Sequence, residues 1–193
     1  MKQSIRLIAF LISFLPSSVF SQWNFKKGVI ITASGEKIEG SISPSFKING
    51  KLTFLSGDNN KQTYKPFELK AFTVDSINYF SYSNDFYEEL STGPKATLYK
   101  KITDNSDERV YNGSEAVGFT KTTEGSKGAF YLRCGEEIKL DLIIRKIFKN
   151  YFARLFEKDE KTVSKIKDGR LDYGQLKNVV ELYNSQYGSA LSQ

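Results

Sequence analysis

The chain contains no histidine and only one cysteine, Cys134, among its 193 residues. Protein sites for zinc and other transition metals are built largely from histidine and cysteine ligands. A Ser-His-Asp triad and a Cys-His nucleophilic pair also need a histidine. The sequence therefore predicts no cofactor, no metal site and no catalytic residues, which favours a non-catalytic protein. No intramolecular disulfide can form, and Cys134 is expected to be a small buried apolar residue, with a reactive or intermolecularly paired thiol as the alternative.

The N-terminal apolar run is short. Leu7–Leu15 (LIAFLISFL) has nine residues, whereas a membrane-spanning helix needs about 20. Basic residues precede the run, Pro16 follows it, and Ser21 stands before a plausible cleavage point at Gln22. This layout predicts a signal peptide over residues 1–21 and no transmembrane segment after its removal. The protein is expected to be exported, and to be periplasmic, outer-membrane-associated or secreted.

The chain carries little excess charge. Removal of residues 1–21 leaves 172 residues with 26 basic and 22 acidic side chains, a net charge of +4. A balance this mild, without a clustered basic arm, argues against a nucleic-acid partner. The expected partner is a protein or a glycan of the cell envelope.

Residues 22–140 are predicted to form a β-rich domain. Apolar residues alternate on both sides of a glycine-containing turn in Gly28–Ile42, which is typical of a β-hairpin. Similar alternation predicts further strands at 51–55, 62–66, 69–74, 78–82, 86–90, 96–102, 129–133 and 137–139. A polar stretch, 103–127, interrupts this pattern with one short strand at Val117–Phe119. Frequent turns between short strands indicate a small antiparallel sheet or barrel.

Residues 141–193 are predicted to form a helical segment packed on that sheet, which makes the fold class α+β. Apolar residues from Leu140 to Phe156 follow helical spacing, and Asp141 suits the start of this helix. A short helix is expected at 160–167, with Asp159 as its N-cap. The last helix is expected to begin at Asp172, with Gln175 in the capping-box position.

Several of these segments resemble a group of exported proteins. The frame Gly28-x-Ile30-x-Thr32-x-x-Gly35-x-x-Ile38-x-Gly40-x-Ile42 is similar to the opening of uncharacterised exported β-rich proteins of Gram-negative bacteria. The similarity continues at Leu52–Phe54, Tyr64–Phe72, Gly93, Leu98-Tyr99 and Leu182-Tyr183-Asn184. The resemblance implies a β-rich module with a helical tail in the bacterial envelope, and it implies no activity.

Aromatic residues crowd one predicted hairpin and mark the candidate ligand or partner surface. They are Tyr79, Phe80, Tyr82, Phe86 and Tyr87. Because successive strand residues point to opposite faces, one face of this hairpin is expected in the core, and the other either covers the helices or contacts a partner. The favoured function is an exported, non-catalytic envelope interaction or structural module. The alternatives are a carbohydrate-active hydrolase with Glu68 in a carboxylate pair, and a carrier of a lipid or small ligand.

Overall fold

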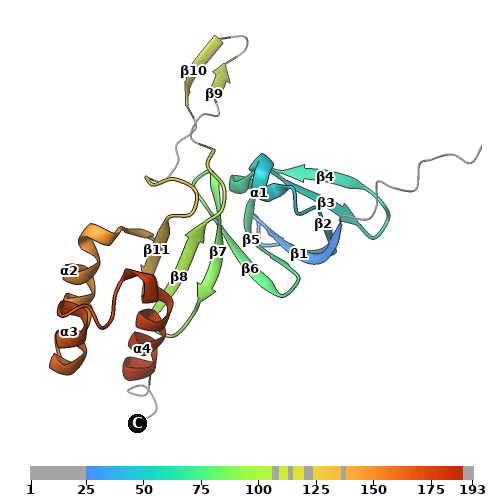
Figure 1. The fold of residues 1–193 in the computed structure, drawn as a ribbon. Helices are drawn as coiled ribbons and strands as arrows, with labels where there is room; N and C mark the ends of the chain where they lie inside the picture. Colours follow the sequence, from blue (N-terminus) through green and yellow to red (C-terminus); the bar gives the residue numbers. More distant parts are fainter. Residues whose placement is uncertain (1–24, 106–108, 113–114, 120–123, 136–137, 189–193) are drawn as a thin grey trace, which may run out of the picture.

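The computed structural model describes residues 25–105, 109–112, 115–119, 124–135 and 138–188 (Figure 1). The protein has an α+β fold in which a ten-stranded antiparallel sheet is followed by C-terminal helices. The elements of the first part are β1 (Lys26–Thr32), β2 (Lys37–Ile42), α1 (Phe46–Asn49), β3 (Leu52–Ser56), β4 (Lys61–Tyr64), η2 (Pro66–Glu68), β5 (Leu69–Val74), β6 (Ile77–Tyr82), β7 (Asp85–Ser91), β8 (Ala96–Lys101), β9 (Arg109–Asn112), β10 (Glu115–Phe119), β11 (Phe130–Cys134) and β12 (Asp141–Ile143). The C-terminal elements are α2 (Arg145–Leu155), α3 (Glu160–Lys167), η3 (Tyr173–Gln175) and α4 (Leu176–Gly188). The predicted fold class is confirmed.

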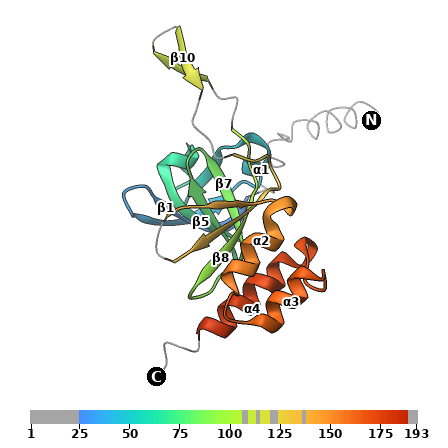
Figure 2. The ribbon, with the colours of Figure 1, turned by 90° about the vertical axis from the view of Figure 1, so that its left-hand side faces the viewer.

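The large sheet has the strand order β12-β11-β8-β7-β6-β5-β1-β2-β3-β4. The hairpins predicted from local alternation are present as β1–β2, β3–β4 and β6–β7, all antiparallel. The strands β9 and β10 form a separate two-stranded ribbon that projects from the body in both views (Figures 1 and 2). The long polar stretch therefore contains the hairpin β9–β10. The sequence predicted only part of its second strand, at Val117–Phe119.

Two glycines in the opening hairpin are required by packing. Gly28 lies opposite Gly40 in the β1–β2 pair. A Cβ atom on Gly28 would lie 2.5 Å from the Thr73 carbonyl oxygen, and one on Gly40 would lie 2.4 Å from the Leu55 carbonyl oxygen. Neither strand can accept a larger residue at this point without moving its neighbour.

The first core fills the space enclosed by the N-terminal strands and α1. Phe46 of α1 makes edge-to-face contacts with Phe72 and Tyr79, at centroid distances of 5.0 and 5.2 Å. Phe86 is a third neighbour, at 6.2 Å. All four rings are buried. These rings fill the interior space in which a carrier would have to bind a lipid or small ligand.

The second core lies between the sheet and the C-terminal helices. Buried residues of α2, α3 and α4 pack against β8 and β11, and Figure 2 shows the three helices gathered beside β8. The buried apolar residues of these three helices are Phe148, Phe152, Ile166, Leu176, Val179 and Val180. In the last helix, the predicted packing of the helical segment on the sheet is made by Leu176, Val179 and Val180. Among the described residues, no helix has the length and hydrophobicity that crossing a membrane requires.

The predicted helix caps are confirmed. The Asp159 carboxylate accepts a hydrogen bond from the Thr162 amide at 3.1 Å, as expected for the N-cap of α3. Asp172 accepts from the Gly174 amide at 2.8 Å, and the Gln175 side chain accepts from the Asp172 amide at 3.3 Å. This capping box begins η3, which continues directly into α4.

The predicted start of the first C-terminal helix is wrong. Asp141–Ile143 form the edge strand β12, which pairs with β11, and the helix begins only at Arg145. Ile143 is fully buried in the second core, so pairing with β11 and burial outweigh the local helical pattern. The helical segment therefore begins four residues later than the boundary at 141. Of the strand predicted at 137–139, residue 137 lies outside the described residues, and Ile138 and Lys139 are not in a strand. The predicted signal peptide also lies outside the described residues.

Candidate functional site

Two of the five predicted surface aromatics lie in the first core. Tyr79 is 3% exposed and stacks on Phe72 at a centroid distance of 4.7 Å, and Phe86 is fully buried. Both point to the face of the sheet that α1 covers. Neither ring can contact a partner, because this face of the hairpin is packed in the first core.

The other three rings belong to an aromatic face on the opposite side of the sheet. This aromatic face consists of Phe80, Tyr82, Tyr87, Tyr99 and Tyr131. Tyr87 contacts Tyr131 edge-to-face at 5.2 Å, and Phe80 contacts Tyr99 at 5.4 Å. Tyr87, Tyr99 and Tyr131 are at most 1% exposed, whereas Phe80 and Tyr82 are half-buried. The predicted five-ring surface is therefore reduced to Phe80 and Tyr82.

A guanidinium group covers part of the aromatic face. The Arg133 guanidinium lies 5.7 Å from the Phe80 ring centroid and 5.6 Å from that of Tyr99, within the range of cation–π attraction. Burial raises the pKa of the Tyr99 hydroxyl, and the charge of Arg133 offsets part of this rise. Since Arg133 occupies one side of Phe80, Tyr82 is the predicted residue that is best placed to meet a ligand.

Tyr82 lines a groove beside the edge strand β12 that we call the tyrosine groove. Its volume is about 540 Å³, and it lies between the aromatic face and α2. The lining residues are Tyr82, Glu124, Tyr131, Lys139, Leu140, Asp141, Leu142, Ile147, Tyr151 and Arg154. Its size is within the range of small-ligand sites, roughly 300–1,000 Å³. The groove combines aromatic, aliphatic and charged groups in one place.

Residues on one face of α2 form one side of the tyrosine groove. Ile147, Tyr151 and Arg154 are four and three residues apart, so they share one face of α2. The sequence predicted only that apolar residues from Leu140 to Phe156 follow helical spacing, and it did not connect Tyr151 or Arg154 with a site. The signal that would have found them is this i, i+4, i+7 spacing read with the correct start of α2.

Hydrogen bonds hold the polar groups of the tyrosine groove in place. The Tyr151 hydroxyl donates to Asp141 Oδ2 at 2.9 Å, and Lys139 Nζ lies 3.7 Å from Asp141 Oδ1. Burial, with the neighbouring Cys134 and Asp141, raises the pKa of Tyr151 far above its ordinary value. The Tyr131 hydroxyl donates to the backbone carbonyl of Glu124. These contacts hold Tyr131, Asp141 and Tyr151 in place at the groove.

Cys134 lies behind Tyr151 rather than in the groove. The residue is half-buried and packs against the second core, as its predicted role as a small apolar residue requires. Burial raises the pKa of the thiol, and a hydrogen bond with the Tyr151 hydroxyl offsets only part of this rise. A thiol held in its protonated form is a poor nucleophile.

A buried ion pair supports the far wall of the tyrosine groove. Lys101 Nζ lies 3.1 Å from Asp85 Oδ2, and both side chains are fully buried. Lys101 also donates to the Gly125 carbonyl at 2.9 Å, next to Glu124. Burial raises the pKa of Asp85, although Lys101, Asn105 and Thr103 each stabilise its carboxylate. Because neither partner is accessible, the pair is a structural element of the groove wall.

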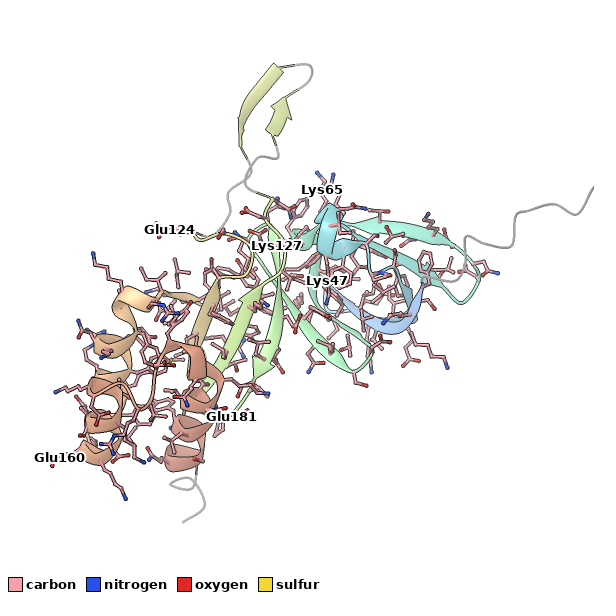
Figure 3. All side chains as sticks on the ribbon, viewed as in Figure 1. Lys47, Lys65, Glu124, Lys127, Glu160 and Glu181 are labelled. Carbon is pink, nitrogen blue, oxygen red and sulfur yellow. The ribbon has the colours of Figure 1, made fainter. Side chains whose placement is uncertain are left out.

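Glu68, the acid proposed for the hydrolase alternative, occupies a capping position. Its carboxylate accepts a hydrogen bond from the Lys65 amide at 2.6 Å and closes the capping box of η2. The side chain is exposed. Within the tyrosine groove the two acids are Glu124 and Asp141, and Figure 3 shows Glu124 extending outward from its loop.

A larger cleft of about 810 Å³ lies over strands β1, β2, β3 and β5. Its lining consists mainly of glycines, serines and other small or aliphatic residues, with Lys27, Glu39 and Asp75 as its charged residues. It has no aromatic side chain on which a ligand could stack. We therefore regard the tyrosine groove as the better candidate site.

Within the described part of the chain, no three or more His, Cys, Asp or Glu side chains gather closely enough to hold a metal ion. The chemistry that the tyrosine groove offers is stacking, hydrogen bonding and charge contacts. Comparison of the chain with models of protein families, with curated proteins and with solved structures gave no match.

Proposed function

We propose that this protein is an exported, non-catalytic binding module of the bacterial cell envelope, and that it holds its partner in the tyrosine groove. The observation that carries the proposal is the meeting of Tyr82 from β6 with Tyr151 and Arg154 from α2 in one groove of about 540 Å³. Binding sites combine apolar and aromatic walls with a few fixed polar groups in this way. Asp141, held by Tyr151, is such a fixed group.

The proposed export rests on the sequence. Lys2 and Arg6, the apolar run Leu7–Leu15 and Ser21 follow the order of a secretory signal peptide. The resemblance of the opening hairpin to exported envelope proteins supports the same location. Expression of the full chain in a Gram-negative bacterium, followed by mass analysis of the product, tests this part. We expect an exported protein that begins at Gln22, and an unprocessed chain in the cytoplasm would contradict it.

Site-specific photo-crosslinking tests the groove. A benzoylphenylalanine at position 82 should give crosslinked adducts in whole envelopes, whereas the same residue at position 67 should not. Phe67 is a matched control because it is also aromatic, is 57% exposed and lies outside the tyrosine groove, on η2. A second substitution, Arg154→Ala, should reduce the yield of adducts from position 82. Equal adducts from both positions, or adducts that do not respond to Arg154→Ala, would contradict the proposed binding site.

A further inference from the structure

We propose that the tyrosine groove binds an uncharged glycan, an inference that rests on the proposed binding function and names the class of ligand for the same site. The described side chains that line the groove carry two positive charges, on Lys139 and Arg154, and two negative charges, on Glu124 and Asp141. A lining with balanced charges gives no net attraction for a polyanion or a polycation. The partner that it fits is neutral and polar.

The polar groups of the groove match a ligand rich in hydroxyl groups. The Asp141 carboxylate has four acceptor positions, and its contacts with Tyr151 and Lys139 leave room for others. Arg154 is exposed and adds up to five donors. A sugar hydroxyl both donates and accepts, so neighbouring hydroxyls can bond to a carboxylate and a guanidinium at the same time.

The apolar groups of the groove match the flat face of a sugar ring. Tyr82 is half-buried, and its ring is backed by Phe80 at a centroid distance of 6.3 Å and by Tyr87 at 6.4 Å. This backing fixes the ring, so that little conformational entropy is lost when a ligand stacks on it. Ile147 is 37% exposed and extends the apolar surface along α2.

An extended peptide is a poorer occupant, although the groove lies beside an edge strand. A peptide binds a sheet edge by adding a strand, and this requires a row of free backbone groups. Strand β12 has only three residues, and its Ile143 carbonyl already accepts a hydrogen bond from the Tyr173 hydroxyl at 3.1 Å. The edge is therefore too short for strand addition, with its Ile143 carbonyl already occupied, and recognition falls to the side chains.

Calorimetric titration of the protein lacking residues 1–21 tests the inference. Three of the probes are neutral tetrasaccharides: fully N-acetylated chitotetraose, maltotetraose and cellotetraose. The fourth probe, tetragalacturonate, is an acidic tetrasaccharide. We expect saturable binding of at least one neutral probe that is tighter than binding of tetragalacturonate. Arg154→Ala and Tyr82→Ala should each weaken it by about tenfold or more, and Phe67→Ala should leave it unchanged. Thermal melting of each variant checks that it is folded, and the exposed position of Arg154 keeps the test open if Tyr82→Ala does not fold.

The glycan inference would be overturned if no neutral probe binds or if tetragalacturonate binds more tightly than the neutral probes. It would also be overturned if neither Tyr82→Ala nor Arg154→Ala weakens binding. Crosslinks from position 82 without glycan binding would overturn it while leaving the proposed binding function in place. Products from a bound tetrasaccharide would instead contradict the non-catalytic proposal, and Asp141→Asn would then test whether the acids of the groove catalyse the hydrolysis.

Discussion

The side chain of Asn184 in α4 hydrogen-bonds to both backbone groups of Ala96 at the start of β8. Its Oδ1 accepts from the Ala96 amide at 2.9 Å, and its Nδ2 donates to the Ala96 carbonyl at 2.9 Å. The same Oδ1 accepts from the Lys95 amide at 3.1 Å. One side chain thus satisfies three backbone groups of the sheet and fixes the last helix to it.

Gly93 makes room for this contact. A Cβ atom at position 93 would lie 2.3 Å from Asn184 Cγ, so any larger residue would push α4 away from the sheet. The close approach of Gly93 and Asn184 therefore sets the distance between α4 and the sheet.

We predict that Asn184→Ala lowers the free energy of unfolding by about 2–3 kcal/mol, because the buried Ala96 amide and carbonyl lose their partners. Urea denaturation measures the change, and the slope with denaturant should stay the same. Gly93→Ala should also destabilise the protein. Gly57→Ala is the control, because no atom lies within 4 Å of a Cβ there, and its effect should stay within about 0.5 kcal/mol. An effect equally small for Asn184→Ala would refute the prediction.

The buried pair of Asp85 and Lys101 gives a second prediction about stability. Removal of one partner of a buried ion pair typically costs about 3–5 kcal/mol. Lys101→Met should destabilise the protein by that amount. Asp85→Asn should cost less than Lys101→Met, because Lys101 Nζ still lies 3.7 Å from Asp104 Oδ1 and the new amide keeps an oxygen to accept from Thr103 and Asn105.

A double-mutant cycle on this pair separates the charge interaction from the loss of packing. The double variant Asp85→Asn, Lys101→Met should be more stable than the sum of the two single effects predicts, by at least about 1 kcal/mol. Denaturation of all four proteins under one set of conditions supplies the measurement. Additive effects would mean that Asp85 and Lys101 stabilise the fold independently.

Features that depend on neighbours in sequence were predictable. The hairpins β1–β2 and β6–β7 follow from alternation on both sides of a short turn, and the caps at Asp159 and Asp172 follow from residues three or fewer positions apart. Strand β12 was not predictable, because Asp141–Ile143 fit a helical pattern locally and become a strand only by pairing with β11.

The site was predictable only in part, for the same physical reason. The crowding of rings around Tyr82 is visible in the sequence, but the local pattern does not show which face of the hairpin the core will occupy. Tyr151 meets Tyr82 in the tyrosine groove only because α2 packs beside the edge strand. The pair of Asp85 and Lys101 is likewise formed by the alignment of β7 with β8.

The buried tyrosines predict a loss of stability at alkaline pH. Burial raises the pKa of Tyr99 and of Tyr151 in the folded protein, whereas unfolded tyrosines ionise near pH 10. As the pH rises above this value, the unfolded chain loses these protons first and binds fewer protons than the folded chain. The free energy of unfolding must then fall with increasing pH. Below about pH 9 both states are protonated, and these two groups contribute no slope.

Absorbance at 295 nm and urea denaturation test this prediction. Fewer tyrosines should ionise at pH 11 in the folded protein than in urea, and stability should decline between pH 9 and pH 11. Tyr151→Phe should reduce the decline. The same substitution of Tyr64, whose hydroxyl bonds to the exposed Gln62 on β4, should reduce it less. Identical titration curves for the folded and unfolded chain would contradict the assignment.

Cys134 should react slowly with thiol reagents in the folded protein. Burial raises its pKa, so the thiolate fraction at pH 8 is smaller than that of an exposed cysteine. The half-buried position of the sulfur slows the reaction further. The rate with 5,5′-dithiobis(2-nitrobenzoic acid) should rise by more than about tenfold in urea, where the thiol regains its ordinary pKa. In the folded protein the rate should begin to increase only at a higher pH than in urea. Equal rates in the two states would show instead that Cys134 is an exposed thiol, free to pair with a partner.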